Sequence, residues 1–164
     1  MADEISLEIV TPEGPQISVM VSEFTAPSVD GEFGVLAGHR PLLAATRAGI
    51  VSYRQGGEDV QVAVGEGYVD YNADHVKILT EHFSTKDAVD AVHVRLELKA
   101  AGDELADFEG EPGSPEYLTL IARELWAAAQ LELYGDPPPP TIRNEFSTQK
   151  EEMFEDDGED DDLD

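Results

Sequence analysis

The sequence predicts an α+β protein in which an N-terminal antiparallel β-sandwich precedes a C-terminal two-helix hairpin and a disordered acidic tail. Three observations predict it: apolar residues alternate with polar ones in the first half, recur every three or four residues later, and almost vanish from the acidic end. These patterns divide the chain into a β domain (residues 1–84), a helical hairpin (85–135), and a proline-rich linker with a disordered tail (136–164).

Short runs of alternating apolar residues predict half-buried strands in the first domain. The alternating positions are Ile5, Leu7, Ile9, Ile17, Val19, Val21, Val60, Val62, Val64, Val69, Tyr71, Val76 and Ile78. Turn sequences such as PEGP at 12–15 and QGGE at 55–58 separate the runs, and no helical pattern intervenes. Closely spaced strands joined by tight turns favour an antiparallel sandwich or barrel over a parallel sheet.

The hydrophobic period changes near residue 85, which predicts the first helix. Ser84 and Thr85, followed by Asp87, are typical of a helix N-cap with an acid in the first turn. Its buried stripe is expected at Val94, Leu98, Ala101, Leu105 and Phe108.

A second helix is predicted to begin after Ser114, because a serine cap, Pro115 at the first helical position and Glu116 in the first turn all favour a helix start. Gly135 and the prolines at 137–140 are expected to end it. Its buried stripe is expected at Leu118, Ile121, Ala122, Leu125, Ala128 and Ala129.

The composition restricts the partners of the protein. Thirty-six acidic residues against ten basic ones give the 164-residue chain a formal net charge of −26, which disfavours binding to nucleic acid or to an anionic lipid surface. The sequence has no cysteine and no apolar run of about eighteen residues, so neither thiol chemistry nor direct membrane insertion is expected. The final residues, EEMFEDDGEDDDLD, are too acidic and too poor in apolar groups to order themselves.

The sequence also predicts that the chain is not an enzyme. It contains no GxxxxGK[ST], GxGxxG, GxSxG or HExxH motif. Asp74 precedes His75 and Glu81 precedes His82, but adjacent strand residues point to opposite faces of a sheet, so neither pair predicts a metal or acid–base site. No catalytic, cofactor-binding or metal-binding residue is therefore predicted, and no cofactor is expected.

One segment, from Val29 to Arg47, is too rich in glycine and too irregular for a single strand. The residues Gly31, Gly34 and Gly38 are expected to adopt positive φ or to approach a neighbour closely, while Phe33, Val35 and Leu36 anchor the loop from beneath. Glu32 and His39 are its exposed candidates for contact with a partner. Spacing alone favours an ordinary solvated acid and an ordinary turn histidine at these two positions.

Residues 29–54, VDGEFGVLAGHRPLLAATRAGIVSYR, resemble the signature segment of the epsilon subunits of F-type ATP synthases, with GEFGVL, GHRPLL and AGIV in the family's order. LEIVTPEGP and VAVGEGYVDYNADHVKILTE are also similar, so the resemblance covers residues 5–83. It implies a non-catalytic rotor subunit that docks on the gamma subunit and on the membrane rotor ring, coupling proton- or sodium-driven rotation to ATP synthesis. It also implies that Glu32 and His39 form the ring interface, at the cytoplasmic face of the bacterial plasma membrane.

The resemblance also implies possible roles for the helical hairpin. In this family the hairpin can contact the beta subunits of the catalytic head and restrain ATP hydrolysis, and some members bind ATP through an [I/L]DxxRA motif on the first helix. Here the matching residues 89–94 are VDAVHV, with His93 at the arginine position. An imidazole cannot replace the charged, planar guanidinium, so nucleotide binding is not expected.

A second hypothesis, from a different class, is a stand-alone acidic module with a regulatory or chaperone-like role toward basic clients. A third, a small hydrolase, lacks a nucleophile, a base and an oxyanion site. Co-purification separates the first two hypotheses, because a rotor subunit accompanies gamma and the catalytic head in stoichiometric amounts.

Overall fold

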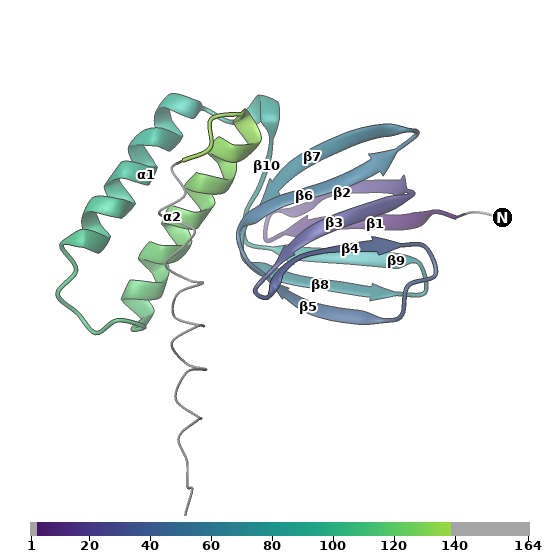
Figure 1. The fold of residues 1–164 in the computed structure, drawn as a ribbon, viewed down its shortest axis with the longest axis horizontal. Coiled ribbons are helices and arrows are strands. Elements are labelled where there is room, and N and C mark those ends of the chain that lie inside the picture. The colour runs from purple at the N-terminus through teal and green to yellow at the C-terminus, as the bar shows by residue number, and fades with distance from the viewer. Residues whose placement is uncertain (1–2, 139–164) are drawn as a thin grey trace, which may run out of the picture.

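The computed structural model describes residues 3–138, so the predicted acidic tail lies outside the described residues. Within this range a layered body of strands carries a pair of helices beside one end (Figure 1). The strands are β1 (Ile5–Thr11), β2 (Gly14–Val21), β3 (Glu23–Ser28), β4 (Gly31–Leu36), β5 (Leu42–Thr46), β6 (Gly49–Gln55), β7 (Glu58–Val64), β8 (Gly67–Asn72), β9 (His75–Thr80) and β10 (Phe83–Thr85). A 3₁₀ turn, η1 (Lys86–Ala88), leads to α1 (Ala91–Ala106) and α2 (Pro115–Tyr134).

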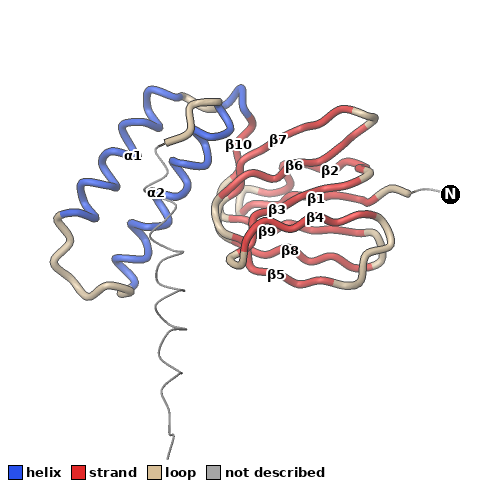
Figure 2. Tube along the Cα trace, in the orientation of Figure 1, coloured by secondary structure: helices blue, strands red, loops and turns tan. Residues whose placement is uncertain are grey.

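The strands pair in the order β10-β7-β6-β3-β5-β8-β9-β1-β2, with β4 added beside β3. The path folds over where β3 meets β5, since these strands share only the pair Ser28↔Thr46. One layer therefore holds β4, β3, β6, β7 and β10, and the other holds β5, β8, β9, β1 and β2 (Figure 2). This confirms the predicted sandwich, with one correction: β1 and β9 pair in parallel. A parallel pair needs a long connection, and here the intervening strands supply it.

The predicted alternation places the core between the two layers. Ile5, Leu7 and Ile9 of β1 are fully buried, and so are Val69 and Ile78 on the neighbouring strands. These side chains share one cluster with inward residues of the opposite layer, among them Val51 and Val62. Burial of this apolar surface is the main force that stabilises the β domain.

The start of the first helix differs from the prediction. Residues 83–85 form β10, in which Ser84 pairs with Ala63 of β7, so Ser84 and Thr85 do not cap α1. Thr85 precedes the short η1 turn, with Asp87 in that turn but without a side-chain capping hydrogen bond. The cap of α1 is Asp90, whose carboxylate accepts a hydrogen bond from the His93 N–H at 3.1 Å. Strand pairing with β7 satisfies the backbone at this point and overrides the local capping signal.

The ends of α2 agree with the prediction, but its buried face does so only in part. Ser114 Oγ accepts a hydrogen bond from the Tyr117 N–H, and Gly135 closes the helix with a φ of +105°. Leu118, expected in the buried stripe, is 54% exposed. It lies in the first turn of α2, at the end of the helix that leans away from the strands (Figure 1).

The hairpin packs on the sandwich through α2. Ala63 of β7 and Ile50 of β6 meet α2 in a second apolar cluster that also contains Val89, Ala91, Val94, Leu98, Trp126, Ala127, Leu131 and Leu133. Small alanine side chains let the helix approach the strands closely. Within residues 3–138, no helix combines the length and the apolarity that a membrane crossing requires.

Candidate docking surfaces

The glycine-rich segment forms a strand and a turn, where the sequence predicted one irregular loop. β4 pairs with β3 alone among the described strands, so its other edge is unpaired. Phe33 and Val35 face the core, and the Phe33 ring meets Phe24 edge-on at a centroid distance of 6.5 Å. Leu36, expected as an anchor, is 62% exposed because successive residues of a strand point to opposite faces.

The three glycines have different roles. Gly31 has a φ of +119° in the β3–β4 turn, and Gly38 has a φ of +83° in the turn after β4, as expected. Gly34 lies inside β4, is not among the positive-φ residues, and an added Cβ would meet Thr25 Cγ2 at an ordinary 3.6 Å. The expectation for Gly34 is therefore wrong, because neither backbone conformation nor crowding requires glycine there.

Glu32 and His39 are both exposed but lie toward opposite ends of β4. Glu32 borders a cleft that α2 lines with Ala128 and Ala129, whereas His39 follows the strand end that points away from the helices (Figure 1). The four residue steps from Glu32 to the end of β4 span about 13 Å. The two residues therefore do not form one compact patch.

The turn that carries His39 is tied to the neighbouring β8–β9 turn by Asp74. One carboxylate oxygen of Asp74 accepts hydrogen bonds from the Gly38 N–H at 2.8 Å and from the Tyr71 hydroxyl at 2.7 Å. The Gly38 bond and then the Tyr71 bond lower the pKa of the Asp74 carboxyl. The His39 ring meets Tyr71 edge-on at 5.8 Å. No local pattern in the sequence predicts this hydrogen bond of Asp74, because its two partners lie 36 residues apart.

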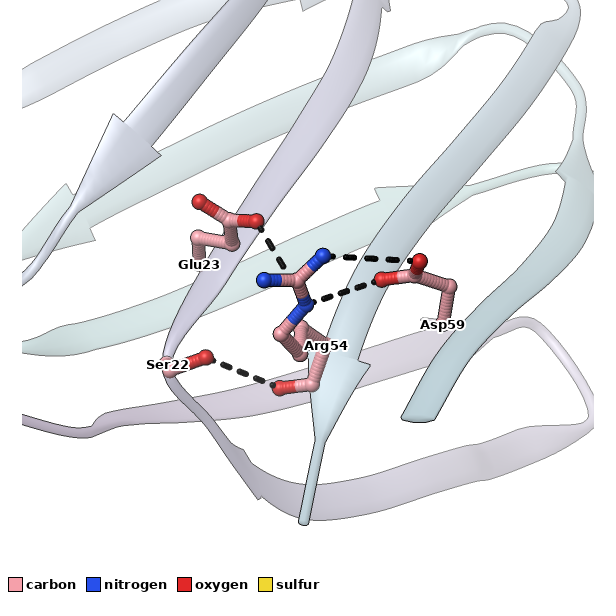
Figure 3. A network of polar contacts seen from close by, with 4 residues as sticks. All are labelled: Ser22, Glu23, Arg54 and Asp59. Carbon is pink, nitrogen blue, oxygen red and sulfur yellow. Dashed lines mark hydrogen bonds and ion pairs between the residues drawn. The ribbon is translucent and has the colours of Figure 1, made fainter. Parts of the chain in front are cut away.

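A second polar network lies in the first layer, where the start of β3 meets the β6–β7 hairpin (Figure 3). The Arg54 guanidinium donates to both carboxylate oxygens of Asp59, at 3.0 and 3.5 Å, and lies 3.8 Å from Glu23. The Arg54 carbonyl accepts hydrogen bonds from Ser22, so the β2–β3 corner is held against β6. These groups are solvent-exposed, and the network fixes a corner without creating a catalytic arrangement.

The outer face of the second layer carries an apolar row. Strand register aligns Ala45, Tyr68, Leu79, Val10 and Pro15 across β5, β8, β9, β1 and β2. Tyr68 is 58% exposed and Leu79 is 46% exposed. Both described α-helices belong to the hairpin, and its sheet contacts are with the other layer. A row of exposed apolar side chains on a sheet face is typical of a protein–protein interface.

The cations of α1 and α2 are paired with acids of the same helices or of the segment after α2. Arg95 bonds Asp136 at 2.8 Å, and Lys99 bonds Asp103 at 2.6 Å. Arg123 lies 3.1 Å from Glu104 and 3.8 Å from Glu97. His93 is exposed on α1. Across residues 3–138, no three histidine or carboxylate side chains are grouped to hold a metal ion.

Comparison with known proteins relates this geometry to one family. A family profile described as "ATP synthase, Delta/Epsilon chain, beta-sandwich domain" matches residues 4–86. The "ATP synthase epsilon chain 2" of Syntrophotalea carbinolica is 36% identical over 135 residues, covering 82% of this chain and 96% of that protein. The "ATP synthase epsilon chain" of Magnetococcus marinus is 39% identical over 132 residues, covering 80% and 94%.

Solved structures share the fold. A chain in the cryo-EM structure of the Euglena gracilis mitochondrial ATP synthase, titled OSCP/F1/c-ring, has a TM-score of 0.58 at 22% identity, with 83% of this chain and 80% of that chain covered. A chain of the Tetrahymena thermophila mitochondrial ATP synthase central stalk/c-ring has a TM-score of 0.50 at 12% identity, covering 79% and 96%. At these identities the likeness concerns the fold alone.

Proposed function

This chain belongs to the family of ATP synthase epsilon chains, and we propose that this non-catalytic stalk subunit couples rotation of the membrane ring to ATP synthesis by docking on the gamma subunit and on the ring. It is a component of a membrane-associated complex, and we place it on the cytoplasmic face of a bacterial plasma membrane. Family membership over most of the chain disfavours the alternative of a stand-alone acidic module.

The proposed docking surface for the gamma subunit is the apolar row on the outer face of the second layer. In a chain with a net charge of −26, this row offers Tyr68, Leu79 and Val10 side by side on a rigid sheet. The adjacent row alternates in charge as Asp70, Lys77 and Glu8, with an ion pair between Lys77 and Glu8 at 3.9 Å. An apolar centre beside polar groups suits a permanent interface, because the centre supplies affinity and the rim supplies orientation.

Co-purification of the assembled enzyme tests the gamma surface. Leu79→Glu places a charge at the centre of the apolar row and is expected to reduce the amount of gamma retained about tenfold or more. Leu118→Glu is the matched control, because Leu118 is 54% exposed on α2, away from this face. Equal retention by the two variants would contradict the assignment of the surface.

We place the ring contact along the unpaired edge of β4, from Glu32 to His39. The two residues lie toward opposite ends of that strand, so one ring surface meets both only if it runs along the edge. A carboxylate and an imidazole can form charge-assisted hydrogen bonds with polar groups of the ring loops. Neither end of the sandwich alone presents both side chains, so only a contact along the β4 edge engages Glu32 and His39 together.

Single and double variants test this edge. Glu32→Lys and His39→Ala are each expected to weaken attachment to the ring by severalfold, and the double variant more, while binding to gamma survives. Glu66→Lys makes the same charge change at an exposed turn outside the edge and serves as the control. If only one of the two single variants weakens attachment, the ring meets one end of β4 and the edge-on geometry is wrong.

The hairpin could contact the beta subunits of the catalytic head either through its basic side chains or through its exposed apolar ones. The three cations of α1 and α2, Arg95, Lys99 and Arg123, already pair with acids in cis. A restraint of ATP hydrolysis through these cations would have to break those pairs first. We therefore propose that any such contact uses the exposed apolar residues Val92 and Leu96 of α1.

A further inference from the structure

The β8–β9 turn has an unusual backbone. Ala73 has a φ of +50° and Asp74 a φ of +59°, and they are the only residues other than glycine with positive φ within residues 3–138. Two-residue hairpin turns with positive φ at both positions strongly favour glycine at the second. Alanine and aspartate there cost backbone energy, so a compensating interaction is expected at this turn.

The carboxylate of Asp74 supplies that interaction. It accepts the Gly38 N–H at 2.8 Å and the Tyr71 hydroxyl at 2.7 Å on the same oxygen atom, and so joins the β8–β9 turn to the β4–β5 connection (residues 37–41). Gly38 lies inside a turn that the His39 N–H closes by donating to the Leu36 carbonyl. A glycine at position 74 would adopt the same backbone at lower cost but would lose the acceptor.

The same contacts orient His39. Its ring stands edge-on to Tyr71, with an interplanar angle of 88°, and Tyr71 is fully buried beneath it. The ring nitrogen Nδ1 lies 2.7 Å from the Arg40 carbonyl oxygen. A hydrogen bond from Nδ1–H to this carbonyl leaves the lone pair of Nε2 for an external donor in the neutral ring.

We propose that Asp74 is a positioning residue, which holds the 37–41 connection through Gly38 and Tyr71 in the conformation that presents His39 to the rotor ring. This inference rests on the ring contact proposed above. Asp74 itself is half-buried and need not touch the ring. Its contribution is to order the connection before docking, which reduces the conformational entropy lost on binding.

Three variants of the full chain separate positioning from stability. Asp74→Gly relaxes the turn backbone but removes the acceptor of the Tyr71 hydroxyl and the Gly38 N–H, so these opposing effects are expected to leave only a small net change in thermal stability. Asp74→Asn keeps an oxygen acceptor and tolerates positive φ, so it is the conservative rescue. Ala73→Gly relaxes the same turn with the carboxylate intact and is the matched control.

Two measurements are made on each variant. In NMR spectra of the isolated chain, Asp74→Gly is expected to shift the Gly38 amide proton upfield and to increase fast motion at residues 37–41, while Asp74→Asn and Ala73→Gly stay close to the wild type. In the assembled enzyme, Asp74→Gly is expected to lower affinity for the ring about fivefold, the scale of one hydrogen bond. Attachment to gamma should not change.

Two results would overturn the inference. The first is an Asp74→Gly chain in which Gly38 and residues 37–41 keep their wild-type shifts and motion. The second is an Asp74→Gly chain with a loosened connection but undiminished ring affinity, when His39→Ala does weaken the ring. If His39→Ala has no effect on the ring, the ring contact itself is wrong, and the positioning role falls with it even if the NMR result holds.

Discussion

The imidazole of His82 stacks on the indole of Trp126, with ring centroids 5.3 Å apart and planes inclined by 23°. His82 lies between β9 and β10, and Trp126 lies on α2, so the stack joins the sandwich directly to the hairpin. Gly65 lets His82 approach closely, since an added Cβ there would come within 3.2 Å of the His82 side chain, and its N–H donates to the His82 carbonyl at 2.9 Å. The stack thus fixes where α2 rests on the sheet.

Trp126→Ala is expected to destabilise the docked hairpin by about 1–2 kcal/mol, from loss of the ring pair and of half-buried apolar area. Urea unfolding of the full chain measures this change. Tyr134→Ala is the control, because Tyr134 is an aromatic residue of α2 that is 44% exposed. Equal destabilisation by both variants would mean that the stack adds nothing beyond ordinary helix packing.

The Arg54–Asp59 pair predicts a pH dependence. The hydrogen bond from Arg54, and then its charge, hold the pKa of the Asp59 carboxyl below its ordinary value of 3.8. An unfolded aspartate binds its proton at a higher pH, so the stability from this pair is present above 3.8 and is lost as pH falls further, through the folded pKa. Both side chains are exposed, so the effect should be small and should shrink in salt.

Comparison of the wild type with Asp59→Asn isolates this effect. The many other acids titrate in both chains and cancel in the difference between their free energies of unfolding. That difference should favour the wild type at neutral pH and approach its low-pH limit below 3.8. A difference that does not vary with pH would show that the pair does not stabilise the fold.

The sandwich should fold without the hairpin, because its core is closed between its own two layers. A chain of residues 1–88 keeps β10 and η1 and is expected to unfold cooperatively in urea. A chain ending at Ser84 loses Thr85, which pairs with Val62, and should be less stable. Both lose the cover that α2 gives to Ile50 and Ala63. Absence of cooperative unfolding in the longer chain would mean that the hairpin is part of the folding unit.

The isolated subunit should not bind Mg-ATP in the micromolar range. His93 replaces the arginine of the nucleotide motif, Arg95 and Arg123 are paired with acids, and the net charge of −26 repels a triphosphate. Calorimetric titration at several salt concentrations measures this directly. His93→Arg tests whether a single cation restores binding, and we expect little, since the neighbouring arginines stay engaged. Saturable binding by the wild type would show that backbone amides or these arginines form a site.

Local patterns in the sequence determined most of the architecture. Alternation placed Ile5, Leu7 and Ile9 in the core, and the serine cap and Gly135 located the ends of α2, because strand period and helix termini depend on neighbouring residues. The order of short motifs in residues 29–54 identified the family. These signals need no knowledge of which strands meet.

Long-range contacts decided the rest. Pairing with β7 made Ser84 a strand residue where a helix cap was expected, and the tilt of α2 away from the strands left Leu118 exposed. Because residues 31–36 form a strand, Glu32 and His39 lie toward opposite ends of β4. A hydrogen bond between residues 36 positions apart lets Asp74 join the β8–β9 turn to the turn at Gly38. Such outcomes depend on which distant backbone and side-chain groups satisfy each other, and only the folded chain specifies that.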